Sequence, residues 1–408
     1  MTPAIDSTRG SSVNSLQRRC VVDIAAARAV LARYMLPVEP EQAGIINAFG
    51  RTLAQDLASD ASVPPRDEAA KTGYAVIASD TACATRESPR RLSVLSTAST
   101  FSKRIEPGTV MPVREGEPLP EGADAVVATA DCYRPEQGPE VLVFIETEPG
   151  ANVVPAGSRL PAGEVLLRQG CVVGPVEMEI LAMLGRHGVA VRRKPRIGVL
   201  TTGAGVVDIL EDVKPGQSRN AARYALIGML LDSGCDLGRL IHVRECRVGL
   251  ERALAQCAGC DAVIVALASN DKHDAALEAL SSVGTRCFDR VQIAPGGACA
   301  FGIACDTPVF IIDSASVIEV FEAIVRPGLM MMLGREPIDR PRLRAALNST
   351  LRLNPGYAHF IRAHTLFEPQ RCVAKPVTTQ SAETNSLIVV EQNVEIVKRG
   401  EGVDVILL

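Results

Sequence analysis

The first half of the chain shows two kinds of hydrophobic pattern. Ile24, Ala27, Leu31 and Tyr34 recur at helical spacing after Asp23, a suitable N-cap, so a helix is predicted there. From about residue 63 to 150, short Val-rich runs stand between Pro- and Gly-rich turns, which is typical of a small β domain. The predicted strands are Tyr74–Ile77, Ala125–Ala128 and Val141–Ile145, and Pro175 then opens a helix over Val176–Leu184.

From Arg196 onward, short apolar strands alternate with helices. This βαβ pattern predicts a mostly parallel sheet covered on both faces, and ligands of such sheets bind outside the carboxyl ends of the strands. We therefore expect the site in the loops 201–208, 267–274, 294–302 and 312–316. The predicted strands are Ile197–Leu200, Leu240–Val243, Ala262–Leu267, Val291–Ile293 and Val309–Ile312; the predicted helices are Tyr224–Leu231, Leu250–Gln256, Ala275–Leu280 and Val317–Val325, the last ended by Pro327 and Gly328.

The two ends of the chain have patterns of their own. Residues 1 to about 20 are rich in Ser, Thr and Arg, so we expect them to be disordered. From about residue 340 short apolar runs return, which predicts a small C-terminal β domain. Its predicted strands are Ser349–Leu353, His359–Ala363, Leu387–Val390 and Val403–Leu407.

Composition narrows the functional class. The 408 residues are 47% hydrophobic and 22% charged with a net charge of −4, which is ordinary for a globular protein and gives no footprint for nucleic acid. No run reaches the ~18 apolar residues of a membrane span, and the polar start lacks a signal-peptide core, so we expect a cytoplasmic protein. Twelve Cys are scattered, and the Cys257–Cys260 C-x-x-C lacks a second pair at zinc spacing, which predicts reduced thiols.

Several motifs stand in a characteristic order over roughly residues 20 to 408. They are Gly50–Asp56 (GRTLAQD), Pro64–Asp67 followed by Gly73–Val76, Leu119–Val127 (LPEGADAVV), Gly150–Val153, Lys194–Gly203, Pro295–Gly297 and Arg326–Gly328. In sequence and spacing they resemble the molybdopterin molybdenumtransferase family, which includes MoeA and the E domain of gephyrin. No single motif is decisive, but their order over that length is specific.

The resemblance implies a multidomain α/β plus β fold and a homodimer. Its parts are an elongated helical and linker domain (21–50 and 150–194), an inserted β domain (51–149), an α/β domain that binds molybdopterin (195–335) and a C-terminal β barrel (336–408). We expect the helical domain to form most of the dimer contact. Apolar positions at helical spacing could serve that contact or pack within one chain: Ile24, Leu31, Ile180 and Leu184.

The implied reaction inserts molybdenum from molybdate into adenylated molybdopterin and releases AMP, assisted by Mg²⁺. By resemblance, Asp67 and Asp274 would be catalytic, and Asp271 with Asp274 would bind Mg²⁺ through hard carboxylate oxygens. Other readings stay open, since Asp67 could be a surface carboxylate and Asp274 a helix N-cap. The residues implied to bind the pterin ligand are Thr202, Gly203, Asn220, Ser269, Pro295 and Gly296, of which Pro295 and Gly296 could instead form only a turn.

The chain departs from the family pattern where the chemistry lies. Thr72 replaces an Asp, Ala204 and Gly205 replace an acidic pair, and Leu267–Ala268 replaces a Gly pair. Ala294 and Gly297 replace two lysines that would contact phosphates or an oxyanion. Substitute cations could come from nearby loops or could be solvated surface charges: Lys214, Arg219, Arg223, Lys272 and His273, the last of which could be an exposed loop histidine.

These losses leave the functional class open. One hypothesis is a divergent transferase with reduced or lost activity. A second is a non-catalytic pseudoenzyme that keeps the dimeric scaffold and binds a protein partner in cofactor assembly. A third keeps the pocket for a different pterin or nucleotide. Fold tolerates the loss of site residues, whereas function depends on them.

Overall fold

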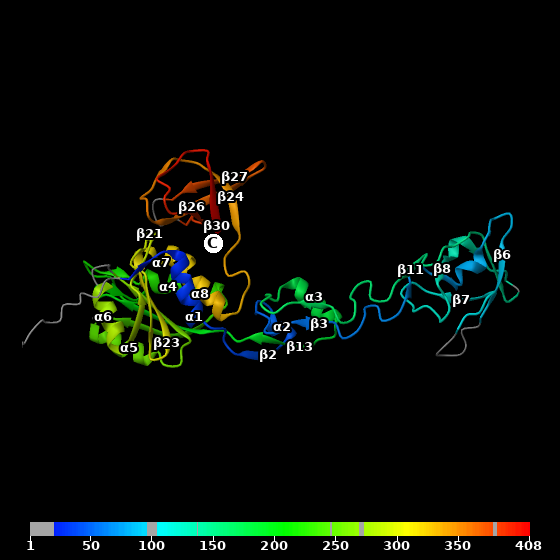
Figure 1. Cartoon of the computed structure of the whole chain (residues 1–408), viewed down its shortest axis with the longest axis horizontal. Coiled ribbons are helices and arrows are strands. Elements are labelled where there is room, and N and C mark those ends of the chain that lie inside the picture. The colour runs from blue at the N-terminus through cyan, green and yellow to red at the C-terminus, as the bar shows by residue number, and fades with distance from the viewer. Residues whose placement is uncertain (1–19, 96–103, 137, 245–246, 269–272, 378–381) are drawn as a thin grey trace, which may run out of the picture.

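The computed structural model describes residues 20–95, 104–136, 138–244, 247–268, 273–377 and 382–408. Figure 1 shows an elongated chain with the α/β unit near one end, a small middle unit, and a β domain at the other end. The C-terminal β unit lies beside the α/β unit. The fold is therefore multidomain α/β plus β, as predicted. The expected disorder of residues 1–20 lies, up to residue 19, outside the described residues.

The α/β unit is built on a six-stranded sheet of order β17-β14-β18-β23-β22-β19. The first four strands are parallel, and β22 runs antiparallel to both of its neighbours, β23 and β19. Helix α4 (Ala221–Asp232) packs on one face of this sheet, and α5 (Arg247–Gln256) and α6 (His273–Val283) pack on the other. The strands are β14 (Arg196–Thr202), β17 (Asp236–Val243), β18 (Ala262–Leu267), β19 (Gly284–Phe288), β22 (Ala300–Ala304) and β23 (Thr307–Asp313).

Helix α1 (Ile24–Tyr34) begins as predicted, because the Asp23 carboxylate accepts from the Ala26 N–H at 2.7 Å. It belongs to the α/β core, however. Ala27 and Leu31 are fully buried there, and Ile24 packs against the same cluster. For this helix the apolar stripe packs within one chain, so it is not free for a dimer contact.

The helix predicted to end at Pro327 and Gly328 continues to Met332. It runs through α7 (Val317–Val320), a π-helical turn (Phe321–Val325) and α8 (Arg326–Met332). Pro327 has no N–H for the carbonyl four residues earlier, that of Ala323. The Arg28 guanidinium of α1 donates to this oxygen instead, from Nη2 at 3.1 Å and from Nε at 3.3 Å. The Arg28 side chain, distant in sequence, thus supplies the hydrogen bond that Pro327 cannot make. The prediction that the helix ends at Pro327 was wrong because it used the local sequence alone.

The middle unit is formed by two chain segments, one before and one after the β domain in sequence. Strand β2 (Pro40–Gly44) pairs with β13 (Gly188–Arg192), and α2 (Ile45–Ala48) and α3 (Pro175–Met183) cover that unit's core. The β domain is a six-stranded sheet of order β8-β5-β7-β6-β10-β9. Its strands are β5 (Gly73–Val76), β6 (Arg90–Val94), β7 (Thr109–Val113), β8 (Ala125–Ala128), β9 (Cys132–Tyr133) and β10 (Glu140–Val143).

Four further short strand pairs occur. Between the middle unit and the β domain, β3 (Leu57–Ala58) pairs with β12 (Val165–Leu167), and β4 (Glu68–Ala69) pairs with β11 (Val153–Val154). Within the α/β unit, β1 (Val21–Val22) pairs with β20 (Arg290–Val291), and β15 (Val206–Val207) pairs with β16 (Ser218–Arg219). None of the described helices is long and apolar enough to cross a membrane. The cysteines of the described residues are free thiols, of which Cys235, Cys257 and Cys299 are buried and Cys20, Cys83 and Cys305 are exposed. Burial raises the pKa of Cys257 to about 12.

The C-terminal domain is a closed β barrel, since β26 pairs with both β27 and β28. Strand β21 (Ile293–Ala294) of the α/β unit extends it along β26. Glu319 of α7 and Arg362 of β26 also join the two units. The barrel strands are β24 (Arg342–Leu347), β26 (Ala358–Glu368), β27 (Arg371–Pro376), β28 (Ser386–Val390) and β30 (Gly402–Leu407), with β25 (Leu351–Arg352) pairing β29 (Ile396–Val397).

Candidate functional site

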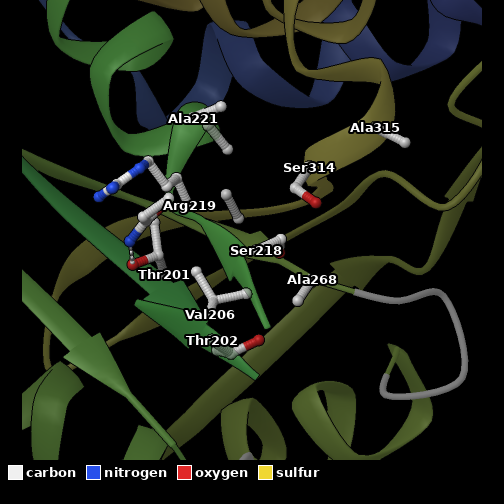
Figure 2. A pocket seen from close by; sticks show the side chains of 12 residues that line it. Thr201, Thr202, Val206, Ser218, Arg219, Ala221, Ala268, Ser314 and Ala315 are labelled. Carbon is white, nitrogen blue, oxygen red and sulfur yellow. Dashed lines mark hydrogen bonds between the residues drawn. The ribbon is translucent and has the colours of Figure 1, made fainter. Parts of the chain in front are cut away.

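An open pocket of about 200 Å³ lies at the carboxyl edge of the parallel strands, where the βαβ pattern predicts a site. Its walls come from the ends of β14, β18 and β23 and from the start of α4 (Figure 2). Residues 294–302 contribute nothing to this lining. The lining residues are Thr201, Thr202, Val206, Ser218, Arg219, Asn220, Ala221, Ala222, Ala266, Ala268, Ser314 and Ala315.

The loop after β14 requires glycine at position 203. Its φ is +137°, in a region that L side chains rarely adopt. A Cβ on Gly203 would also lie 2.7 Å from the Ala268 Cβ and 3.0 Å from Cγ2 of Val206. The Ala268 methyl, which stands where the family pattern has glycine, therefore lies directly against this loop and narrows the pocket.

A chain of hydrogen bonds joins the loop to helix α4. Asn220 is the N-cap, and its side-chain oxygen accepts from the Arg223 N–H at 3.2 Å. The Asn220 amide donates to Thr201 Oγ1 at 2.8 Å, drawn dashed in Figure 2. Thr201 Oγ1 lies 3.0 Å from His242 Nδ1, and His242 Nε2 lies 3.1 Å from the Gly203 carbonyl oxygen. Side chains from two neighbouring strands thus orient the helix cap.

The pocket offers hydrogen-bond donors. Ala221 and Ala222 line it at the N-terminus of α4, where backbone N–H groups have no partner within the helix. Thr202 Oγ1 is buried and has no hydrogen-bond partner among the described residues. Because a buried hydroxyl without a partner is costly, a ligand that bonds to Thr202 would gain from it. The arrangement suits an anionic ligand with several acceptor atoms.

The nearby arginines are engaged by the protein itself. Arg219 Nη1 donates to the carbonyl oxygens of Asp208 and Glu211 at 3.3 and 2.9 Å. Arg223 pairs with the Asp208 carboxylate at 2.9 Å, and Tyr224 donates to the same carboxylate at 3.3 Å. Burial alone would raise the pKa of Asp208, but these donors and a backbone N–H lower it. Two of the expected substitute cations, Arg219 and Arg223, therefore hold the 208–211 loop in place.

The histidine expected in an exposed loop is buried. His273 is 1% exposed at the start of α6, and its Nε2 donates to the Asp289 carbonyl oxygen at 2.9 Å. Burial lowers the pKa of His273, so the neutral form is favoured and the side chain is not a source of positive charge. Sequence could not show this, because the neighbour that buries it comes from a distant turn.

Asp274 is exposed in the first turn of α6 and does not line the pocket. The N-cap interpretation of Asp274 is wrong, because the helix already begins at His273. Ser269 and Asp271, expected in the ligand and Mg²⁺ sites, lie outside the described residues, as does Lys272.

The remaining predicted residues lie away from the pocket. Asp67 is exposed at the start of the β domain, and its Oδ1 accepts from the Ala156 N–H at 2.7 Å. Figure 1 shows that region, marked by β11, far from the α/β unit of the same chain. Pro295 and Gly296 form a turn after β21, where a Cβ on Gly296 would lie 2.3 Å from Cγ2 of Val320. Neither lines the pocket, whereas Thr202 and Asn220 do and Gly203 borders it.

The donor set does not fit Mg²⁺. No carboxylate occurs among the described residues that line the pocket, and Mg²⁺ prefers carboxylate and phosphate oxygens. The described part of the chain also holds no group of three His, Cys, Asp or Glu side chains able to bind a metal. The described residues of the pocket therefore offer no site for Mg²⁺.

Sequence reasoning placed Thr201 and Ser314 in the loops expected to form the site without naming either as a ligand-binding residue, and it missed His242 and Ser218. Thr201 and Ser314 flank the ends of strands β14 and β23, so position alone could have indicated them. His242 had no such signal, because its contacts with Thr201 and Gly203 depend on the pairing of β14 with β17.

Comparisons with known proteins agree with this fold. The model of the MoeA N-terminal region (domains I and II) matches residues 22–185, and that of the MoeA C-terminal region (domain IV) matches residues 344–408. The molybdopterin molybdenumtransferase of Bacillus subtilis is 25% identical, covering 96% of this chain and 95% of its own. Molybdopterin molybdenumtransferase 1 of Mycobacterium tuberculosis is 28% identical, covering 90% of this chain and 95% of its own. The molybdopterin biosynthesis MoeA structure from Pyrococcus horikosii superimposes with a TM-score of 0.83 at 26% identity, over 95% of this chain and 99% of that one.

Proposed function

This chain belongs to the MoeA family of molybdopterin biosynthesis proteins, and from that premise we propose that it binds a molybdopterin-type ligand in the α/β pocket but inserts molybdenum far more slowly than its transferase relatives. The substrates would be adenylated molybdopterin and molybdate, and the product of the slow reaction would include AMP. The proposal rests on one observation. The pocket has hydrogen-bond donors that can face a ligand, whereas the nearby Arg219 and Arg223 are bonded to the 208–211 loop.

The retained groups support binding. Phosphate oxygens of the ligand would accept from the N–H groups at the start of α4 and from the buried Thr202 hydroxyl. Asn220 keeps the helix capped, and Gly203 lets the loop backbone approach the ligand. The N–H groups and the Gly203 loop are backbone features, which do not depend on the side chains that are replaced at positions 204, 205, 294 and 297.

The missing groups support slow transfer. By resemblance, lysines at positions 294 and 297 would reach the ligand from a loop beside the pocket lining. A hydrogen bond to a charged group contributes about 1.5–3 kcal/mol, so the absence of both lysines, at Ala294 and Gly297, would cost roughly 3–6 kcal/mol before non-additivity. That corresponds to roughly 10²- to 10⁴-fold in binding of the charged transition state. The Ala268 methyl narrows the pocket where it lies against Gly203. The pocket, of about 200 Å³, is smaller than the ~300–1,000 Å³ usual for a ligand of drug size.

The test is a direct assay of both halves of the proposal. Purified chain is incubated with adenylated molybdopterin, molybdate and Mg²⁺, and AMP release is compared with that of the Bacillus subtilis enzyme. We expect a rate below about 1% of that enzyme's rate, together with calorimetric binding of the adenylated ligand. AMP release at the relative's rate, dependent on molybdate, would contradict slow transfer. Absence of any binding would contradict the ligand assignment.

A second function, a homodimeric scaffold for cofactor assembly, rests on a different observation. The middle unit exposes large apolar side chains on and beside α2 and α3: Ile46 (79%), Phe49 (58%), Val176 (61%), Met183 and Val172. Apolar surface of this kind is typical of protein contacts. Light scattering should then give twice the chain mass of 43.3 kDa, and Ile46→Glu with Val176→Glu should reduce it to one chain. A wild-type monomer at micromolar concentration would contradict this.

A further inference from the structure

His242 lies behind the pocket wall, and its two ring nitrogens make different contacts. Nε2 is 3.1 Å from the Gly203 carbonyl oxygen, which can only accept a hydrogen bond. Nε2 must therefore carry a proton. In the neutral imidazole, Nδ1 is then bare and must accept.

The neighbour of Nδ1 is Thr201 Oγ1, at 3.0 Å. Since Nδ1 accepts, the Thr201 hydroxyl donates to it. The same oxygen accepts from the Asn220 amide at 2.8 Å, which leaves the Asn220 oxygen facing the Arg223 N–H that it caps. His242, Thr201 and Asn220 thus form a relay of hydrogen bonds that ends at the start of α4. The position of the proton on His242 fixes the orientation of each group in this relay.

We propose that His242 is a positioning residue: its Nε2–H tautomer, selected by the Gly203 carbonyl, fixes the Thr201 hydroxyl and through it the Asn220 cap, so that the first-turn N–H groups of α4 stay directed at the phosphate part of the ligand. The role rests on the proposed function, because it needs a phosphate-bearing ligand in this pocket. Without an acceptor at Nδ1, the Thr201 hydroxyl would turn to the Asn220 oxygen and compete with the cap.

Two substitutions separate the contacts of His242. Asn places its amide near the position of Nδ1, and Gln places its amide near that of Nε2. His242→Asn therefore keeps an acceptor for Thr201 and gives up the Gly203 contact, whereas His242→Gln does the reverse. A merely structural role would make the larger, better-filling Gln the milder change, so the order of the two variants distinguishes the roles.

The probe is AMP, and its binding is measured by calorimetry under identical conditions for all variants. We expect His242→Gln and Thr201→Val each to weaken AMP binding about 3- to 10-fold, the usual effect of one hydrogen bond. The double variant should be no weaker than either single variant, and His242→Asn should bind like wild type. His187→Gln, an exposed histidine of the middle unit, is the matched control and should change nothing. Wild-type affinity in His242→Gln, or the reverse order of the two variants, would overturn the proposal.

A second measurement stands apart from ligand binding. Nitrogen-15 spectra of the full chain, with the His242 signals identified by their loss in His242→Asn, should show the Nε2–H tautomer. An Nδ1–H tautomer would overturn the relay whatever AMP does. If the spectra show Nε2–H but neither AMP nor adenylated molybdopterin binds wild type, the proposed function fails and the positioning role fails with it, whereas the hydrogen-bond geometry stands.

Discussion

The Ala268 methyl lies against the backbone of Gly203, so close that a Cβ on Gly203 would stand 2.7 Å from the Ala268 Cβ. The two residues directly follow the adjacent parallel strands β14 and β18, and their contact narrows the pocket at this edge of the sheet. Since cores do not tolerate heavy atoms at that distance, each residue restricts what the other can be. With alanine at position 268, the contact leaves no room for a side chain at position 203.

Gly203→Ala should therefore abolish binding of adenylated molybdopterin while leaving the sheet folded. The new methyl must displace Ala268 and Val206, and the backbone must leave its φ of +137°. We expect a loss of at least about 1–3 kcal/mol in stability, measured by thermal unfolding, together with loss of calorimetric binding.

Gly228→Ala is the matched control for that experiment. Gly228 lies in the exposed face of α4, where an added Cβ meets nothing within 4 Å. Because alanine is the better helix former, we expect stabilisation by about 0.5–1 kcal/mol and unchanged ligand binding. Equal behaviour of the two variants would contradict the importance of the Gly203–Ala268 contact.

Docking of the C-terminal barrel should depend on the buried pair of Glu319 and Arg362. Arg362 donates from Nε at 2.7 Å and from Nη2 at 3.2 Å, and Glu319 is only 4% exposed. Arg362→Ala leaves that carboxylate buried without its partner, which typically costs about 3–5 kcal/mol. Urea unfolding should show the loss, and proteolysis should release the barrel.

The exposed pair of Arg344 and Asp404 provides the comparison, since it lies within the same barrel at 2.8 Å. Pairs at the surface contribute about 0–1 kcal/mol, so Arg344→Ala should barely change unfolding. A result in which both arginine variants lose similar stability would show that the barrel is not held to α7 by the buried pair.

Much of the fold could be predicted from local pattern, because strands and helices of the α/β unit differ in period and are bounded by Gly, Pro and caps such as Asp23. The errors arose where a distant contact replaced a local one. Arg28 bonds the Ala323 carbonyl that Pro327 leaves free, so the helix continues past the proline. His273 is buried by the turn that carries Asp289, which no spacing along the chain reveals.

The sequence predicts the edge of the sheet at which the candidate site lies, but not all of the residues that form it. The rule for parallel sheets placed it after the strands, and Thr202 and Asn220 do line the pocket there. Asp67 was carried over by resemblance alone, and within one chain it lies in another domain. The His242 contacts needed the register of β14 on β17, which hydrophobic pattern does not specify.

Asp261 should make the joint between the middle unit and the α/β unit sensitive to acid. Burial raises its pKa, but hydrogen bonds from Arg193 at 2.6 and 2.7 Å and from the Arg196 N–H lower it below the ordinary value in sum. A lowered folded pKa contributes stability that is full above the unfolded value of about 3.9 and is lost as pH falls through the folded value. Urea midpoints measured from pH 6 down to pH 3 should fall steeply below about pH 4 in wild type. Asp261→Asn should be less stable at pH 6 and should lack most of that slope, whereas an unchanged slope would assign the acid sensitivity to other carboxylates.

Restoring one charged group should not restore molybdenum transfer, because the missing groups would act on the same ligand together. Ala294→Lys is sterically the easier change, since position 294 is half-buried at the end of β21. Gly297→Lys is harder, because its Cβ would lie 3.3 Å from the carbonyl oxygens of Ile293 and Val291.

We expect Ala294→Lys alone to leave AMP release at the wild-type level. The combination of Ala294→Lys, Gly297→Lys, Ala204→Asp and Gly205→Glu should raise AMP release in a manner dependent on molybdate and Mg²⁺, and adding Ala268→Gly should raise it further by widening the pocket. Full activity from Ala294→Lys alone would show that a single lysine, and not the joint loss, limits this chain.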